Sequence, residues 1–262
     1  MPYIEFATEY YVNPKYNLAA SDVAPPDYQK YLNTPEFNDL LQKHPYQLMK
    51  NLKTILASKY DVMESQVELT IGVTNGFSTI CQIMKDLGHS TVLTEAPGYE
   101  PLWLTPQGHG FNIVEYQRSL TDYSIKLEQV DNLASKGSWA WMANPHNPSG
   151  KYLNPEEISA MANVMKKNEG YLFVDEIYHD FVTPLGKDSA VHTSDNVIIA
   201  SGLTKAYGMG TLKIGWLIGP ENIIERATIS RLHQFMLLPG PSLAMALLFM
   251  KDQEELRSAQ VR

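Results

Sequence analysis

The chain has 262 residues, of which 44% are hydrophobic and 19% are charged, and its formal net charge is −8. This composition excludes a disordered chain, a coiled coil and a collagenous repeat. Because the charge is acidic and no run of lysine and arginine exceeds two residues, neither nucleic acid nor an anionic membrane is an expected partner. The length predicts one large domain or two small ones, with a full hydrophobic core.

The cysteine content and the first residues bear on the cellular compartment. Cys81 is the single cysteine, so neither an intrachain disulfide nor a cysteine-based zinc site can form, and a reducing compartment is expected. The start, MPYIEFATEYY, lacks the basic and apolar regions of a signal peptide, and no apolar run reaches the ~18–20 residues of a spanning helix. The sequence therefore predicts a soluble cytoplasmic protein without a bound metal.

Residues 1–35 are rich in Tyr, Pro, Asn and Ala and show little periodicity. They are expected to form an extended arm with turns at Pro14 and at Pro25-Pro26. Residues 36–60 space their leucines and isoleucines as in a helix, interrupted at Pro45.

A regular alternation of strands and helices follows. Helices are expected over 77–87 and over 154–168, the second with Asn154 as its N-cap. The expected strands are Glu68–Val73, Thr91–Thr94, Phe111–Tyr116, Trp139–Ala143, Tyr171–Asp175, Val197–Ser201 and Lys213–Ile218. Several are apolar throughout, which is typical of parallel strands covered on both faces. The fold class is therefore α/β, with layers of helices on a mostly parallel sheet.

Ligands of open α/β sheets bind beyond the carboxyl ends of the strands, so the polar residues that follow the strands are candidates. The first group is TNGFST, residues 74–79, where a glycine lies between a strand and a helix. The N–H groups of Gly76, Phe77 and Ser78 are placed to bind a phosphate at the helix start. The alternative is a plain turn in which Ser78 or Thr79 caps the helix.

The second group is ANPHNPSG, residues 143–150, directly after an apolar strand. Its two prolines make the loop rigid and fix Asn147, which suits either ligand binding or a structural turn. His146 is interpreted as an exposed loop histidine.

The third group is VDEIYHD, residues 174–180. Asp175 ends an apolar strand, where a partly buried carboxylate needs a partner, and Tyr178 follows within reach of the same space. Capping of a following helix is the alternative role for Asp175. Glu176 and Asp180 are expected to be solvated charges.

The fourth group is SGLTKAYGMGTLKIGW, residues 201–216. Lys205 lies just beyond a buried strand, where desolvation makes a lysine a nucleophilic amine. Lys213 follows eight residues later. The glycines at 208 and 210 do not form a dinucleotide-binding motif, because the loop leads into a strand rather than a helix. Together the four groups supply a phosphate cradle, an amide, a carboxylate, a phenol and an amine, a set that matches pyridoxal 5′-phosphate.

These motifs resemble those of the fold-type I pyridoxal-phosphate enzymes of the class I/II aminotransferase group. The similarity runs from about residue 60 to 240, and the segments beginning at residues 144, 175 and 201 are close to N-P-x-N-P-[ST]-G, D-E-x-Y and S-x-[ST]-K…G-x-R-x-G-[WY]. The resemblance implies a three-layer α/β/α large domain over residues 61–240. Residues 1–60 would be an N-terminal arm and helical segment, and residues 241–262 the start of a helix that leads to a small C-terminal domain. That domain is expected to be missing.

The resemblance also implies a role for each matching residue. Lys205 would form the aldimine with the cofactor and move the proton during transamination. Asp175 would pair with the pyridine nitrogen, and Asn147 and Tyr178 would bond to the 3′-oxygen. The remaining implied cofactor contacts are the phosphate cradle of Gly76, Phe77 and Ser78, the stacking ring of Tyr99, and Lys213.

Two departures from the family pattern concern the phosphate. Lys213 stands where the family has an arginine, and so lacks the bidentate fork. The family's serine is Gly202 here, with Ser201 one position earlier. The family is often dimeric and takes a tyrosine from the second subunit, for which Tyr46 is the candidate.

The implied function is transamination between an amino acid and a 2-oxo acid by a cytoplasmic homodimer. A pyridoxal-phosphate lyase, decarboxylase or cyclase on the same scaffold is the first alternative, because the motif residues serve all of these reactions. A non-catalytic homologue or fragment is the second alternative, although a scaffold has no need of both Lys205 and Asp175.

Overall fold

The computed structural model describes residues 2–10, 15–16 and 20–252. The α-helices are α1 (Pro2–Tyr10), α2 (Pro35–Leu41), α3 (Pro45–Tyr60), α4 (Gly72–Asp86), α5 (Pro101–Gly108), α6 (Leu127–Leu133), α7 (Pro155–Lys167), α8 (Glu221–Gln234) and α9 (Gly240–Lys251). The strands are β1 (Val67–Ile71), β2 (Thr91–Ala96), β3 (Asn112–Gln117), β4 (Trp139–Ala143), β5 (Leu172–Asp175), β6 (Val197–Gly202) and β7 (Ile214–Ile218). Short 3₁₀ turns are η1 (Tyr28–Lys30), η2 (Glu64–Gln66), η3 (His179–Phe181), η4 (Ala190–His192) and η5 (Gly210–Leu212).

The strands form one sheet in the order β1-β7-β6-β5-β4-β2-β3, with β5 at its centre. All neighbours pair in parallel except β7, which runs antiparallel to both β1 and β6. The predicted α/β class and mostly parallel sheet are confirmed, and every predicted strand forms with small shifts at its ends. As a consequence, β1, β2, β4, β5 and β6 end at the same edge of the sheet at which β7 begins.

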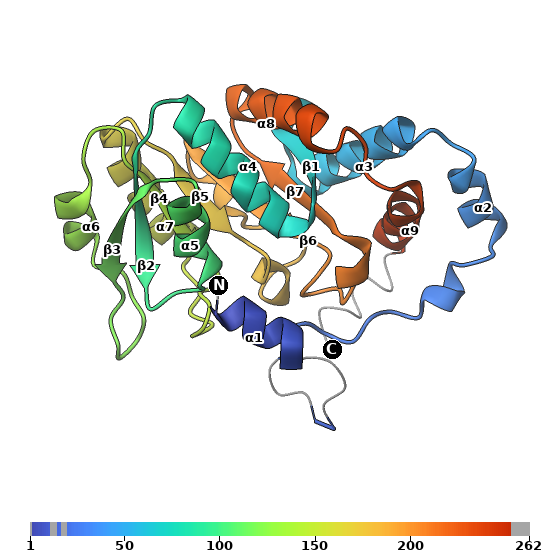
Figure 1. Cartoon of the computed structure of the whole chain (residues 1–262), viewed down its shortest axis with the longest axis horizontal. Helices are drawn as coiled ribbons and strands as arrows, with labels where there is room; N and C mark the ends of the chain where they lie inside the picture. The colour runs from blue at the N-terminus through green and yellow to red at the C-terminus, as the bar shows by residue number, and fades with distance from the viewer. Residues whose placement is uncertain (1, 11–14, 17–19, 253–262) are drawn as a thin grey trace.

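Helices cover both faces of the sheet, which gives three layers (Figure 1). In β4, Trp139 and Trp141 point to the face covered by α4, α5 and α8, whereas Met142 points to the face covered by α3, α7 and α9. The Trp141 ring lies 4.9 Å from the rings of both Phe77 and Phe173, edge to face. This apolar packing fixes the strand ends that carry the candidate side chains.

The helix after β1 begins earlier than predicted. The structure ends the strand at Ile71 and starts α4 at Gly72, so the expected break at residues 74–76 lies inside the first turns of the helix. Gly72 makes the turn with φ +66°, and its N–H donates to the Lys213 carbonyl oxygen at 2.9 Å. The conformation that favours glycine occurs at Gly72 rather than at Gly76.

The N-terminal arm also differs from the prediction. Residues 2–10 form α1, because the aromatic rings of Tyr3, Phe6 and Tyr10 recur at helical spacing and Phe6 and Tyr10 pack at 4.7 Å. The turn expected at Pro14 lies outside the described residues, as does the part of the expected C-terminal helix after residue 252.

Other helices follow the prediction closely. The helical stretch predicted over residues 36–60 is interrupted as expected, since α2 ends at Leu41 and Pro45 begins α3. In α7, Asn154 caps the first turn by accepting from the Glu157 N–H, and the Glu157 carboxylate accepts from the Asn154 N–H.

A close backbone approach at β7 generates a first prediction. A methyl group on Gly215 would lie 2.7 Å from the carbonyl carbon of Gly72 and 2.9 Å from the Val73 nitrogen. We expect Gly215→Ala to lower the free energy of unfolding by roughly 1–3 kcal/mol, because the start of α4 must move away. Urea denaturation measures this. Gly108→Ala is the control, since its methyl would meet nothing within 4 Å. Equal stability of the two variants would contradict the prediction.

Candidate active site

A cavity of about 410 Å³ opens at the edge where the parallel strands end. Its lining comprises Tyr3, Ser21, Ile71, Gly72, Val73, Thr74, Phe77, Tyr99, Asn147, Asp175, Ile177, Tyr178, Thr204, Lys205 and Lys213. Seven residues singled out from the sequence therefore meet around one space, although they come from six separate segments of the chain.

Two of the predicted phosphate-binding residues do not line this cavity. Gly76 is buried within α4, where a methyl group would lie 3.2 Å from the Leu217 side chain, and the Ser78 hydroxyl bonds to His109 Nε2 at 3.0 Å. The lining residues at the start of α4 are Gly72, Val73 and Thr74.

The sequence carries a signal for this position. Gly72 is also a glycine between strand and helix, and it lies nearer the strand than Gly76 does. The first N–H groups of a helix have no partner within the helix, so the start of α4 presents donors toward the cavity. Because the helix dipole is positive at this end, the region favours an anion.

Asp175 is a buried carboxylate in the cavity wall. Its side chain is 2% exposed, and burial raises the pKa of the carboxyl to about 7, with the neighbouring Glu95 and Glu176 carboxylates adding to the shift. Its Oδ1 accepts the Ile177 N–H at 3.1 Å, which together with the charge of Lys205 opposes the shift. A buried carboxylate at a cavity wall favours a ligand with a cationic atom.

Lys205 and Tyr178 share one polar partner from the N-terminal segment. The Ser21 hydroxyl lies 2.7 Å from the Tyr178 hydroxyl and accepts from Lys205 Nζ at 3.0 Å. The Val23 N–H donates to the Lys205 carbonyl oxygen at 3.1 Å, so the segment is also held by its backbone. Burial raises the pKa of Tyr178, which keeps its hydroxyl protonated as a donor. Sequence reasoning missed Ser21, because nothing local connects residue 21 with residues 178 and 205.

Aromatic and polar groups complete the cavity. Tyr99 follows β2 and meets Tyr3 of α1 edge to face, with ring centroids 6.3 Å apart. Asn147 follows β4, and Lys213 precedes β7 with φ +55°. Within the described chain no group of three or more His, Cys, Asp or Glu residues is arranged to hold a metal ion. No helix in the described part of the chain is long and apolar enough to cross a membrane.

Three interpretations of charged or polar residues are wrong. His146 is 1% exposed rather than an exposed loop residue. Glu176 and Asp180, expected to be solvated, are 1% and 3% exposed. Glu176 is buried because it accepts from the Ser189 hydroxyl and the Ala190 N–H, at 2.8 and 2.7 Å. Burial raises the pKa of Asp180 to about 7, against the opposing charge of His179.

The buried carboxyl of Asp175 predicts a pH-dependent cost to folding. With a pKa raised to about 7, the folded protein binds the proton more tightly than the unfolded chain, so the cost is present above pH 7 and vanishes as the pH falls toward 4. Asp175→Asn keeps the acceptor for Ile177 and removes the charge. We expect it to raise the free energy of unfolding by roughly 1–3 kcal/mol at pH 8 and to leave it nearly unchanged at pH 4, where the carboxyl is protonated in the folded protein. Urea denaturation at both pH values checks this, and equal gains at the two values would refute it.

Comparison with known proteins identifies the family. The family model for aminotransferase class I and II matches residues 15–261. Histidinol-phosphate aminotransferase of Halorubrum lacusprofundi is 27% identical over 187 residues, which is 71% of this chain and 51% of that protein. The enzyme of that name from Listeria monocytogenes is 26% identical over 69% of this chain and 50% of its own length. The chain therefore spans about half the length of the curated relatives it matches.

Solved structures share the fold at low sequence identity. A pyridoxal-phosphate-dependent aminotransferase from Streptococcus suis superposes with a TM-score of 0.79 at 16% identity, covering 98% of this chain and 71% of that chain. Aspartate aminotransferase from Thermus thermophilus with maleate gives 0.78 at 18% identity, covering 92% and 66%. The match of the family model to nearly the whole sequence shows that the chain belongs to the class I and II aminotransferases, a family that uses pyridoxal 5′-phosphate.

Proposed function

We propose that this chain binds pyridoxal 5′-phosphate in the cavity at the carboxyl edge of the sheet and takes part in transamination between an amino acid and a 2-oxo acid. The observation that carries the proposal is the convergence of Lys205, Asp175, Tyr178 and Asn147 on one cavity. An amine, a buried carboxylate, a phenol and an amide are the groups that this cofactor requires.

The chemistry of the donor set fits the cofactor at both ends. The desolvated Asp175 carboxylate needs a cationic partner, and a protonated pyridine nitrogen provides one. At the opposite end, the N–H groups of Val73 and Thr74 at the start of α4 and the ammonium of Lys213 suit a phosphate. The cradle proposed here thus lies three to four residues before the one predicted at Gly76 and Ser78.

In this reaction the cofactor and the protein residues would have separate chemical roles. When bound, pyridoxal phosphate supplies an aldehyde that captures an amine and a ring that accepts an electron pair. Lys205 provides that amine before substrate arrives and afterwards acts as a base that removes the proton at the substrate's α-carbon. Tyr178 and Asn147 would donate to the ring oxygen, and Tyr99 would stack on the ring.

The proposal extends to assembly and location. A homodimer is supported by exposed aromatic residues on α1 and α3: Tyr46 is 61% exposed at the first turn of α3, and Phe6 and Tyr10 are more than half exposed on α1. Exposed aromatic rings are enriched in protein interfaces. A cytoplasmic location is proposed on the reduced state expected for the single cysteine, which is buried in α4.

The cofactor site predicts which lysine reacts. After incubation with pyridoxal phosphate and reduction with borohydride, peptide mapping should find the pyridoxyl group on Lys205. Lys205→Ala should lose the label, and Lys213→Ala should keep it on Lys205 with reduced occupancy. A label on Lys213 in the unaltered protein would overturn the site assignment. Transamination is recognised by a 2-oxo acid product that forms only when a second 2-oxo acid is supplied, whereas product without it indicates a lyase or decarboxylase.

Lys213 generates a prediction about the phosphate end. Lys213→Arg should keep or tighten the binding of pyridoxal phosphate, because a guanidinium can donate two parallel bonds where an ammonium acts as a point charge. A spectral titration of the apoprotein measures the dissociation constant. Lys151→Arg, which exchanges the same residue types outside the cavity lining, serves as the control. Strong loss of cofactor in Lys213→Arg alone would contradict the prediction.

A further inference from the structure

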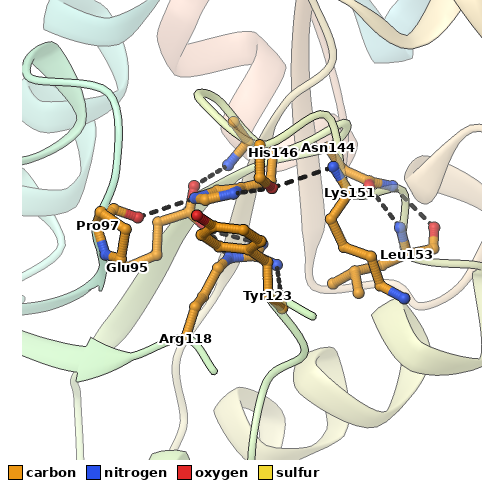
Figure 2. A network of polar contacts seen from close by, with 10 residues as sticks. Glu95, Pro97, Arg118, Tyr123, Asn144, His146, Lys151 and Leu153 are labelled. Carbon is orange, nitrogen blue, oxygen red and sulfur yellow. Dashed lines mark hydrogen bonds and ion pairs between the residues drawn. The ribbon is translucent and has the colours of Figure 1, made fainter. Parts of the chain in front are cut away.

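Two loops at the site each carry a proposed cofactor residue, and one buried histidine joins them (Figure 2). Tyr99 belongs to the loop after β2, and Asn147 belongs to the loop after β4. His146 Nε2 lies 2.8 Å from the Pro97 carbonyl oxygen, and Nδ1 lies 2.7 Å from the Ser149 hydroxyl. Because a carbonyl oxygen only accepts, Nε2 carries the proton and Nδ1 accepts from Ser149. The histidine is therefore a bridge between the two loops.

The surroundings keep this bridge neutral and rigid. Burial and the charge of Arg118 lower the pKa of His146 to about 4. The Tyr123 ring packs beside the imidazole with centroids 5.7 Å apart. Arg118 Nη1 in turn donates to the Tyr123 carbonyl oxygen at 2.8 Å. Neither ring nitrogen of His146 is left to contact a ligand.

A buried ion pair between Glu95 and Arg118 lies next to this bridge. Arg118 Nε donates to Glu95 Oε2 at 2.8 Å, Nη2 lies 2.7 Å from the same oxygen, and both side chains are fully buried. Glu95 Oε1 accepts the Ala143 N–H at 2.9 Å. The pair thus ties the end of β2, which carries Glu95, to the end of β4, one residue before the loop that carries Asn147. Figure 2 shows Glu95, Arg118, Tyr123 and His146 as one contiguous group.

We propose that His146 is a positioning residue that, together with the Glu95–Arg118 pair, sets the separation of the Tyr99 and Asn147 loops to the one that the pyridoxal ring requires. The inference rests on the proposed function. Asn147 is adjacent to His146 in the chain, and Tyr99 follows Pro97 by two residues. A displacement of the His146–Pro97 hydrogen bond would therefore also displace Asn147 and Tyr99. Neither loop has regular secondary structure to hold it otherwise. Displacements of about 1 Å in such contacts are costly in binding and catalysis.

The chain offers a matched control at the other end of the same strands. His89 precedes β2, is 8% exposed, and its Nδ1 bonds to the carbonyl oxygen of Gly137, which precedes β4, at 2.6 Å. His89 therefore bridges the amino ends of β2 and β4 as His146 bridges the segments after their carboxyl ends. His89→Leu and His146→Leu both remove a buried histidine bridge, and both should lower Tm by roughly 2–6 °C.

The experiment measures binding of pyridoxal phosphate by spectral titration and backbone hydrogen exchange in the unliganded protein. We expect His146→Leu to weaken cofactor binding by roughly tenfold to a hundredfold, and His89→Leu to leave it unchanged. His146→Gln should recover most of the affinity, because the amide reaches Pro97 as a donor. Exchange in His146→Leu should accelerate both in residues 97–100 and in residues 144–150.

Three outcomes would overturn the inference. These are wild-type affinity in His146→Leu, an equal loss of affinity in His89→Leu, and faster exchange confined to residues 144–150. If the unaltered protein fails to bind pyridoxal phosphate, the proposed function fails, and hydrogen exchange still decides separately whether His146 couples the two loops.

Discussion

A buried carboxylate at the end of the central strand is the constraint on which the site depends. Asp175 lies near two further buried acids, Glu95 and Glu176, and each of these raises its pKa. Glu95 is compensated by Arg118, and Glu176 is held by two hydrogen bonds, but Asp175 accepts only one backbone N–H within the described structure. The floor of the cavity is therefore short of positive charge, and a ligand that brings a cationic atom there relieves a cost that folding has already imposed.

The arrangement of the strands was predictable because it depends on local apolar patterns. Strands such as β4 are buried on both faces, and a continuous apolar run followed by a polar residue marks both the strand and its functional end. Asp175 and Lys205 were found in this way. The start of α4 was misplaced because two glycines lie between β1 and the helix. Gly72 makes the turn, whereas Gly76 is buried against Leu217, and sequence alone does not distinguish a glycine needed for its φ from one needed for its size.

Burial of polar residues was the feature least accessible from sequence. His146 was expected to be exposed because it follows a proline in a loop, yet its partner at Pro97 lies 49 positions earlier. Glu95 was not singled out at all, and its partner Arg118 lies 23 positions later. A charged or polar side chain is buried where distant segments supply its partners, so its burial is a property of the fold rather than of the local pattern.

The same dependence on distant partners governs the mouth of the cavity. The Ser21 hydroxyl bonds to both the Tyr178 hydroxyl and the Lys205 amine. A ligand that bonds to either group exchanges one hydrogen bond for another, and the net gain is smaller than the bond itself. Because the Val23 N–H anchors the segment through the backbone of Lys205, the Ser21 side chain can give up its bonds while the chain stays in place. Under the proposed function, we therefore expect affinity to come mainly from the buried charge of Asp175 and from the start of α4, whereas Tyr178 and Lys205 contribute mainly orientation.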